Sequence, residues 1–183
     1  MATLTTDDLS DSIRANVYVQ DYSPKPAIDG VKIIPVKNFV GEDGDFCEVL
    51  RLGQNGEIAD LSDFKIAQIN RSRLTPKSIK AWHIHLNQDD LWYLPPSNTL
   101  FVGLWDLRKN SPTHDTTMRI TLGAGQSNLL FIPKGVAHGM KNTSKKDVNL
   151  FYFVNQQFNL QNPDEKRLKW DAKGADFWET PKE

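Results

Sequence analysis

The chain has 183 residues, 39% of them hydrophobic and 25% charged, and its 22 Lys and Arg against 23 Asp and Glu leave a formal net charge of −1. This composition predicts one soluble domain with a modest core and excludes a broadly basic surface for nucleic acid or anionic membranes. The single cysteine, Cys47, excludes an intrachain disulfide framework and a cysteine-rich zinc site. No apolar run is long enough to cross a bilayer, and the polar stretch 1–14 has no secretory signal. We therefore expect a cytoplasmic protein.

Residues 1–30 show no clear periodicity and predict an N-terminal arm, followed by one domain over 31–183. From residue 31 onward, short runs of β-type pattern alternate with turn residues such as Gly41–Gly44. Nine such runs, with almost no 3.6-residue periodicity, predict an all-β sandwich or barrel of antiparallel strands. Only 163–170 is expected to form a short helical turn. The predicted strands are 31–36, 45–52, 64–70, 79–86, 91–94, 99–107, 117–122, 128–132 and 148–155.

Three of the four histidines fall into a recognisable pattern. Alternation along the strand predicted over 79–86 places His83 and His85 on the same face. His138 belongs to the stretch 133–142, which has the form P-x-G-x-x-H-x-x-x-N. A His-x-His strand followed by this stretch resembles the two conserved motifs of the cupin jelly roll, which place their side chains inside the barrel mouth. The resemblance implies an all-β, cupin-type double-stranded β-helix.

Two chemistries suit such a barrel mouth. In a metal-dependent cupin enzyme, His83, His85 and His138 with Asp89 or Asp90 would bind Fe, Mn, Ni or Zn. In a metal-free enzyme, one histidine would act as a general base and a phenol as the acid, at a carbon next to a ketone. The spacing of the residues leaves both open.

A longer set of motifs narrows the choice. Residues 106–113 have the form D-x-R-x-x-S-P-T, and residues 131–139 contain I-P-x-G-x-A-H-G. Shorter matches lie at 68–72, 80–83 and 150–153 and in the tail 169–178. With these motifs, the chain from about residue 39 to 178 resembles the dTDP-4-dehydrorhamnose 3,5-epimerases, a metal-free branch of the cupins.

This resemblance implies a homodimeric sugar-nucleotide epimerase of carbohydrate biosynthesis that needs no cofactor. At the matching positions, His83 is the base that removes a proton α to the 4-keto group of the sugar. Tyr152 is the acid that returns a proton to the opposite face. The small-molecule partner would be a sugar nucleotide, with neither nucleic acid nor membrane. The positions that match the family's pocket, or that face it here, are Glu48, Gln68, Asn70, Lys80, His85, Asp90, His138 and Phe158.

The chain also departs from the family pattern. A substrate-binding Arg falls on Asp43, and the Lys that supports the enolate falls on Asp90. The family's carboxylate partner of the base lies in a C-terminal segment that the sequence does not contain before Glu183. We therefore expect Asp90, Asp43 or Asp171 to orient His83, and a related 4-keto-6-deoxy sugar nucleotide to be inverted at one carbon. The alternatives are the metal-dependent enzyme and a cupin that binds a sugar without catalysis.

Overall fold

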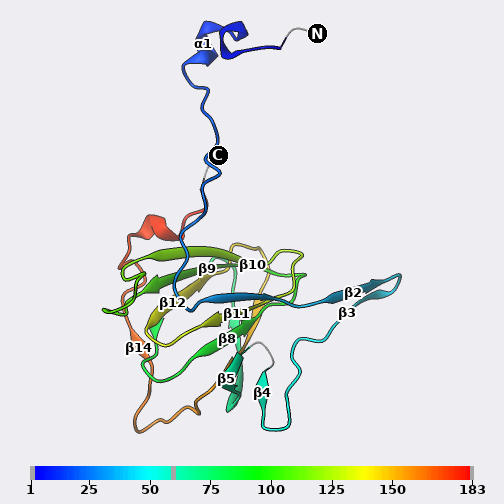
Figure 1. The fold of residues 1–183 in the computed structure, drawn as a ribbon, viewed down its shortest axis with the longest axis vertical. Helices are drawn as coiled ribbons and strands as arrows, with labels where there is room; N and C mark the ends of the chain where they lie inside the picture. The colour runs from blue at the N-terminus through cyan, green and yellow to red at the C-terminus, as the bar shows by residue number, and fades with distance from the viewer. Residues whose placement is uncertain (1–2, 59–60, 182–183) are drawn as a thin grey trace.

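The structure is a computed structural model that describes residues 3–58 and 61–181. Within these residues, two five-stranded antiparallel sheets form the body of the molecule (Figure 1). One sheet has the order β1 (Lys32–Pro35), β11 (Asn128–Ile132), β8 (Asp90–Tyr93), β13 (Val148–Val154) and β6 (Gln68–Leu74). The other has the order β10 (Thr117–Gly123), β9 (Thr99–Asp106), β12 (Val136–Lys141), β7 (Ile79–Ile84) and β14 (Lys166–Arg167). Neighbouring strands are mostly distant in sequence, as in the predicted cupin jelly roll.

The main core fills the space between the two sheets. Leu100, Val102 and Leu104 alternate along β9 and are fully buried, and they pack in one cluster with Leu130 and Leu150 from the other sheet. Because successive side chains of a strand point to opposite faces, each strand contributes every second residue to this core.

A second apolar cluster covers the opposite face of the β7 sheet. The 3₁₀ helix η2 (Ala175–Trp178) places Trp178 against Trp82 and Ala137, and all three side chains are buried. The C-terminal segment therefore packs on the back of the strand that carries the predicted histidines.

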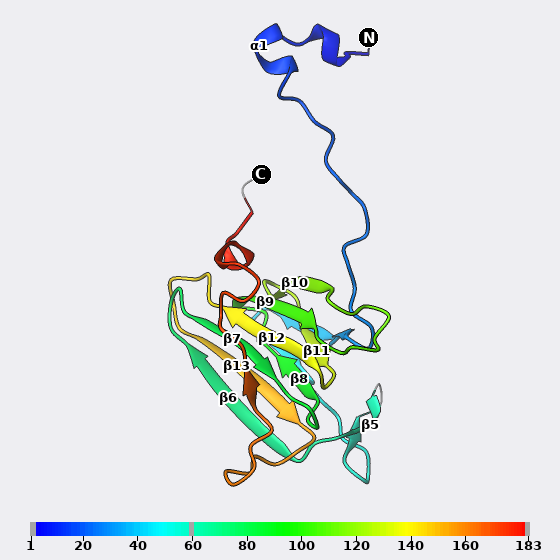
Figure 2. The ribbon, with the colours of Figure 1, turned by 90° about the vertical axis from the view of Figure 1, so that its left-hand side faces the viewer.

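The N-terminal segment leaves the barrel. Residues 3–27 are exposed, and they contain only η1 (Thr6–Asp8) and α1 (Asp11–Arg14) (Figures 1 and 2). Ile28 is the first buried residue. A hairpin of β2 (Asn38–Gly41) and β3 (Gly44–Cys47) also projects from the sheets, with its turn at the predicted position 41–44.

Seven of the nine expected strands recur with shifted ends. The run 45–52 is a strand only to Cys47, as β3, and the run 64–70 is divided between a strand over Leu61–Lys65 and β6. The strand β2 was not expected. The predicted helical turn over 163–170 is wrong: its centre is β14, whose backbone pairs with Ile84 and His83 of β7. The sequence analysis also missed β12, because both faces of that strand are buried and it shows no alternation. A further pair, β4 (Glu57–Ile58) and β5 (Leu61–Lys65), precedes β6. None of the described helices is long and apolar enough to span a membrane.

Candidate active site

A cavity of about 930 Å³ lies against strands β6, β7, β8, β12 and β13 and the segment between residues 156 and 170. Most of the side chains singled out from the sequence line it. They are Gln68, Asn70, Lys80, His83, His85, Asp90, His138, Tyr152 and Phe158.

His83 and His138 face each other from the neighbouring strands β7 and β12, where they pair directly in register. Their rings are nearly parallel, at an angle of 16°, with centroids 6.0 Å apart. Burial lowers the pKa of His138 to about 4, because the charged imidazolium is poorly solvated there. Burial also lowers the pKa of His83, and the nearby charge of Arg167 lowers it further. His83 is therefore mostly neutral at pH 7, the state in which an imidazole can accept a proton.

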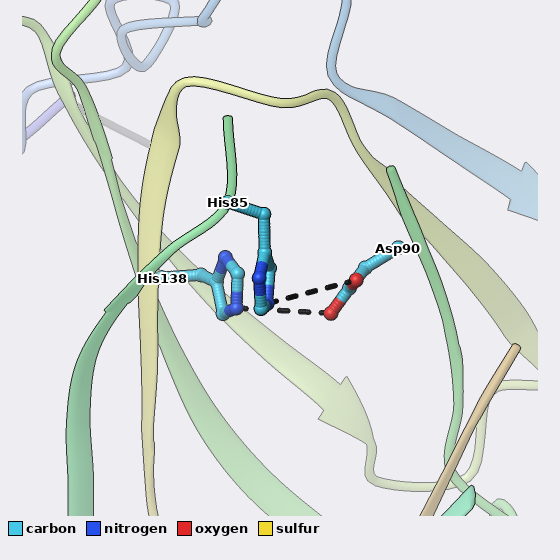
Figure 3. A group of neighbouring side chains, drawn as sticks. All are labelled: His85, Asp90 and His138. Carbon is cyan, nitrogen blue, oxygen red and sulfur yellow. Dashed lines mark ion pairs between the residues drawn. The ribbon is translucent and has the colours of Figure 1, made fainter. Parts of the chain in front are cut away.

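The carboxylate of Asp90 faces the imidazole rings of His85 and His138. Its Oδ1 lies 4.0 Å from Nε2 of His85, and its Oδ2 lies 3.7 Å from Nε2 of His138 (Figure 3). Gln88 Nε2 and Trp92 Nε1 donate hydrogen bonds to the same carboxylate, at 2.7 and 3.0 Å. Ligand atoms of His85, Asp90 and His138 lie within 4.8 Å of one another. These three are the described residues that could hold a metal ion, because imidazole and carboxylate together suit a divalent transition metal.

Two predicted site residues lie elsewhere. Asp89 accepts the Lys134 backbone N–H and the Asn155 side-chain amide, each at 2.8 Å, and it does not line the cavity. The predicted metal set that includes Asp89 is therefore not formed, because the Asp89 carboxylate, just before β8, is bound to Lys134 and Asn155 instead. Glu48 pairs with Arg51 at 2.7 Å and lines a separate groove of about 610 Å³ beside the β2–β3 hairpin.

Tyr152 enters the cavity from β13. In the sheet it lies opposite Asn70 of β6 and Trp92 of β8. Burial raises the pKa of its phenol, and the negative charges of Asp90 and Glu165 raise it further. At neutral pH the phenol therefore keeps its proton and can donate it.

Polar and aromatic groups line another part of the cavity. Gln68 donates to Asn70 Oδ1 at 2.7 Å and accepts the backbone N–H of Phe158 at 2.9 Å. The Phe158 ring is 57% exposed, so it offers a flat apolar surface to a ligand. Lys80 donates to Ser72 Oγ at 2.8 Å and brings a positive charge to the same cavity.

The sequence analysis missed the carboxylate that contacts His83. Glu165 Oε1 lies 3.2 Å from Nδ1 of His83, and Arg167 binds the same carboxylate oxygen. Burial alone would raise the pKa of Glu165, but Arg167 holds it below its ordinary value, so the carboxylate is ionised. The sequence gives no sign of this contact between Glu165 and His83, because residues 164–167 resemble a solvated run of charges. Only the pairing of β14 with β7 reveals it.

The fold and the cavity together define a class of protein. A jelly-roll barrel whose mouth holds a neutral histidine on a carboxylate and a protonated tyrosine is a cupin equipped for acid–base chemistry on a small ligand. Comparison with known proteins specifies the family. A model of the dTDP-4-dehydrorhamnose 3,5-epimerases matches residues 25–178. The chain belongs to this family, and the predicted fold and class, a sugar-nucleotide epimerase, are confirmed.

A curated relative and two solved structures resemble this chain. The chain is 38% identical over 154 residues to the spore coat polysaccharide biosynthesis protein SpsL of Bacillus subtilis, an alignment that covers 84% of this chain and 97% of SpsL. The fold is shared with RmlC of Legionella pneumophila, described in complex with dTDP-4-keto-L-rhamnose (TM-score 0.67, 24% identity, covering 80% of this chain and 77% of RmlC). The fold is also shared with NovW of Streptomyces spheroides, described as a 4-keto-6-deoxy sugar epimerase (TM-score 0.69, 20% identity, covering 89% of this chain and 83% of NovW).

Proposed function

We propose that the protein inverts a carbon next to the keto group of a 4-keto-6-deoxy sugar nucleotide, with His83 as the base and Tyr152 as the acid. The observation that carries this proposal is that a neutral imidazole and a protonated phenol line the same cavity. His83 takes the proton from the carbon α to the ketone, which leaves an enolate. Tyr152 then donates a proton to the opposite face of that carbon, so that its configuration is inverted. Protein groups carry both proton transfers, without a cofactor.

The substrate class follows from the size and lining of the cavity. A volume of about 930 Å³ suits a ligand as large as a nucleotide sugar. Lys80 supplies a cation for the diphosphate, and the exposed ring of Phe158 can stack on the nucleotide base. Asp90, buried in the position of the family's Lys, removes one positive charge from the site.

One experiment tests the proposal. Metal-stripped protein is incubated in D₂O with dTDP-4-keto-6-deoxyglucose, and the C3 and C5 protons of the sugar are followed by NMR. We expect deuterium to replace the proton at one of these carbons, which would establish abstraction by a protein base and identify the carbon. Tight binding of the nucleotide without exchange would contradict the proposal and favour a cupin that only binds its sugar.

The grouping of His85, Asp90 and His138 supports a second candidate, a metal-dependent enzyme. The same experiment separates the two. If exchange is lost on stripping and returns with a divalent transition metal, the metal-dependent enzyme is correct. If stripped protein exchanges the proton at the full rate, the metal-free mechanism is correct.

Replacing Tyr152 with phenylalanine should separate the two proton transfers. The phenyl ring keeps the shape of the side chain but cannot donate a proton. We therefore expect epimer formation to fall by about 10²-fold or more, within the usual contribution of a general acid. Exchange of the α proton with D₂O should fall much less, since His83 can abstract a proton and return deuterium on the same face. An equal loss of both signals would show that Tyr152 is not the acid.

We also propose that the protein is a cytoplasmic homodimer, in which the arm over 1–30 covers the domain over 31–183 of the partner. Residues 3–27 are exposed in the single chain, and Tyr18, Val19 and Tyr22 present 72–91% of their surface to solvent. Apolar side chains on an extended segment favour docking on another surface. Light scattering should give a dimer mass for the full chain and a smaller mass for a chain that begins at Ile28. A monomeric full chain would contradict the proposal.

A further inference from the structure

Residues 164–167 lie against His83 of β7 and against His85, which follows this strand. The backbone of β14 pairs with Ile84 and His83, and Leu168 exchanges two backbone hydrogen bonds with Trp82, at 3.2 and 3.3 Å. The segment that contains Glu165 is therefore held along β7 and is not a free loop.

Asp164 fixes the other end of this segment. Its carboxylate accepts the backbone N–H groups of Leu86, Asn87 and Gln88, at 2.7–3.1 Å. Its backbone carbonyl also contacts Nδ1 of His85. With Asp164 anchored on the turn after β7 and β14 anchored on the strand itself, Glu165 has little freedom to move away from His83.

The contact between Glu165 and His83 decides which ring nitrogen carries the proton. An ionised carboxylate offers only acceptor atoms, so its approach to within 3.2 Å favours the tautomer with the proton on Nδ1. The neutral ring then has its lone pair on Nε2, the nitrogen that can take a proton from a substrate. Arg167 donates to the same oxygen of Glu165 and keeps the carboxylate ionised and in place.

The three aspartates expected to orient His83 do not match this geometry. Asp43 and Asp171 are exposed and do not line the cavity. Asp90 lines it, but its two oxygens face His85 and His138 and accept hydrogen bonds from side chains beside them. Among the described residues, Glu165 makes the carboxylate contact to His83.

We infer that Glu165, braced by Arg167, is the positioning residue that sets the tautomer and the orientation of the His83 base. This inference rests on the proposed function, because it assigns Glu165 a purpose in the proton transfer by His83. The segment that follows β13 thus supplies the carboxylate that contacts His83.

Glu165→Gln tests the inference, because glutamine keeps the length of the side chain and removes its charge. We expect kcat to fall by between about 10-fold and 10⁴-fold, the upper end being the loss seen when a histidine's carboxylate partner becomes an amide in Ser-His-Asp enzymes. KM should stay within about twofold, since Glu165 acts through His83. Glu165→Asp should recover part of the loss. A variant with wild-type kcat would overturn the inference.

A second readout does not depend on activity. In protein labelled with ¹⁵N-histidine, the long-range ¹H–¹⁵N spectrum reports which ring nitrogen of His83 is protonated. We expect the Nδ1–H tautomer in the wild type and a mixture of tautomers in Glu165→Gln. Asp171→Asn, which alters an exposed carboxylate that does not line the cavity, is the matched control and should change neither kcat nor the spectrum. An unchanged tautomer in Glu165→Gln would overturn the inference, whereas a wild type that fails to exchange the substrate proton would count against the proposed function alone.

Discussion

Replacing His83 with asparagine is expected to reduce deuterium exchange at the inverted carbon by about 10³-fold, within the range that a general base contributes. Asparagine keeps a polar side chain in the cavity but has no nitrogen that can accept a proton near neutral pH. The expected loss is large because the other imidazole facing His83 cannot replace it. His138 is almost fully buried, and burial lowers its pKa to about 4. It is therefore a weaker base than His83.

The control for this variant is His114→Asn. His114 is exposed in the turn after β9 and does not line the cavity, so its replacement should leave the exchange rate unchanged. The melting temperatures of both variants should stay close to the wild-type value, because neither side chain belongs to an apolar core cluster. If His83→Asn retained more than a tenth of the wild-type rate, His83 would not be the base.

The placement of the histidines could be predicted because it depends on local pattern. Alternation along a strand puts His83 and His85 on one face whatever the rest of the fold, and both line the cavity. The stretch 133–142 likewise predicted that His138 joins them. Tyr152 followed from alternation along its own strand, and it too lines the cavity.

The carboxylates could not be predicted in the same way. Asp89 and Asp90 are adjacent, and only the start of β8 at Asp90 decides which of them points inward. Glu165 reaches His83 because the chain turns back after β13 and pairs with β7, a contact between residues about eighty positions apart. Such a pairing depends on the register of two strands and leaves no periodic signal in the segment itself.

The stretch 106–113 carried much of the family resemblance, and the structure gives it a stabilising role. Asp106 is fully buried and accepts hydrogen bonds from Arg108, Ser111 and Thr113 at 2.6–3.0 Å. Arg108 also donates to the backbone carbonyl of Asp29 at 2.7 Å, and Thr113 accepts the backbone N–H of Asp29 at 2.9 Å. The Asp106 carboxylate thus holds the two side chains, Arg108 and Thr113, that join the loop after β9 to the point where the N-terminal arm meets the barrel.

Asp106→Asn should accordingly lower the free energy of unfolding by about 3 kcal/mol at pH 7, because it removes the charge that several buried donors share and leaves Arg108 without its partner. Although burial alone would raise the pKa of Asp106, its hydrogen bonds from Arg108, Ser111 and Thr113 hold it well below the ordinary value. A carboxyl whose pKa is lowered by folding stabilises the folded state above its unfolded pKa of about 3.9, and this contribution is lost as the pH falls further. The difference in free energy of unfolding between wild type and Asp106→Asn, measured by urea unfolding, should therefore shrink between pH 5 and pH 2.5.

The control is Asp115→Asn, which removes an exposed carboxylate paired with Lys173. This variant should lose less than about 1 kcal/mol of the free energy of unfolding at any pH. A difference for Asp106→Asn that stayed constant down to pH 2.5 would mean that the ionised carboxylate does not hold this junction together.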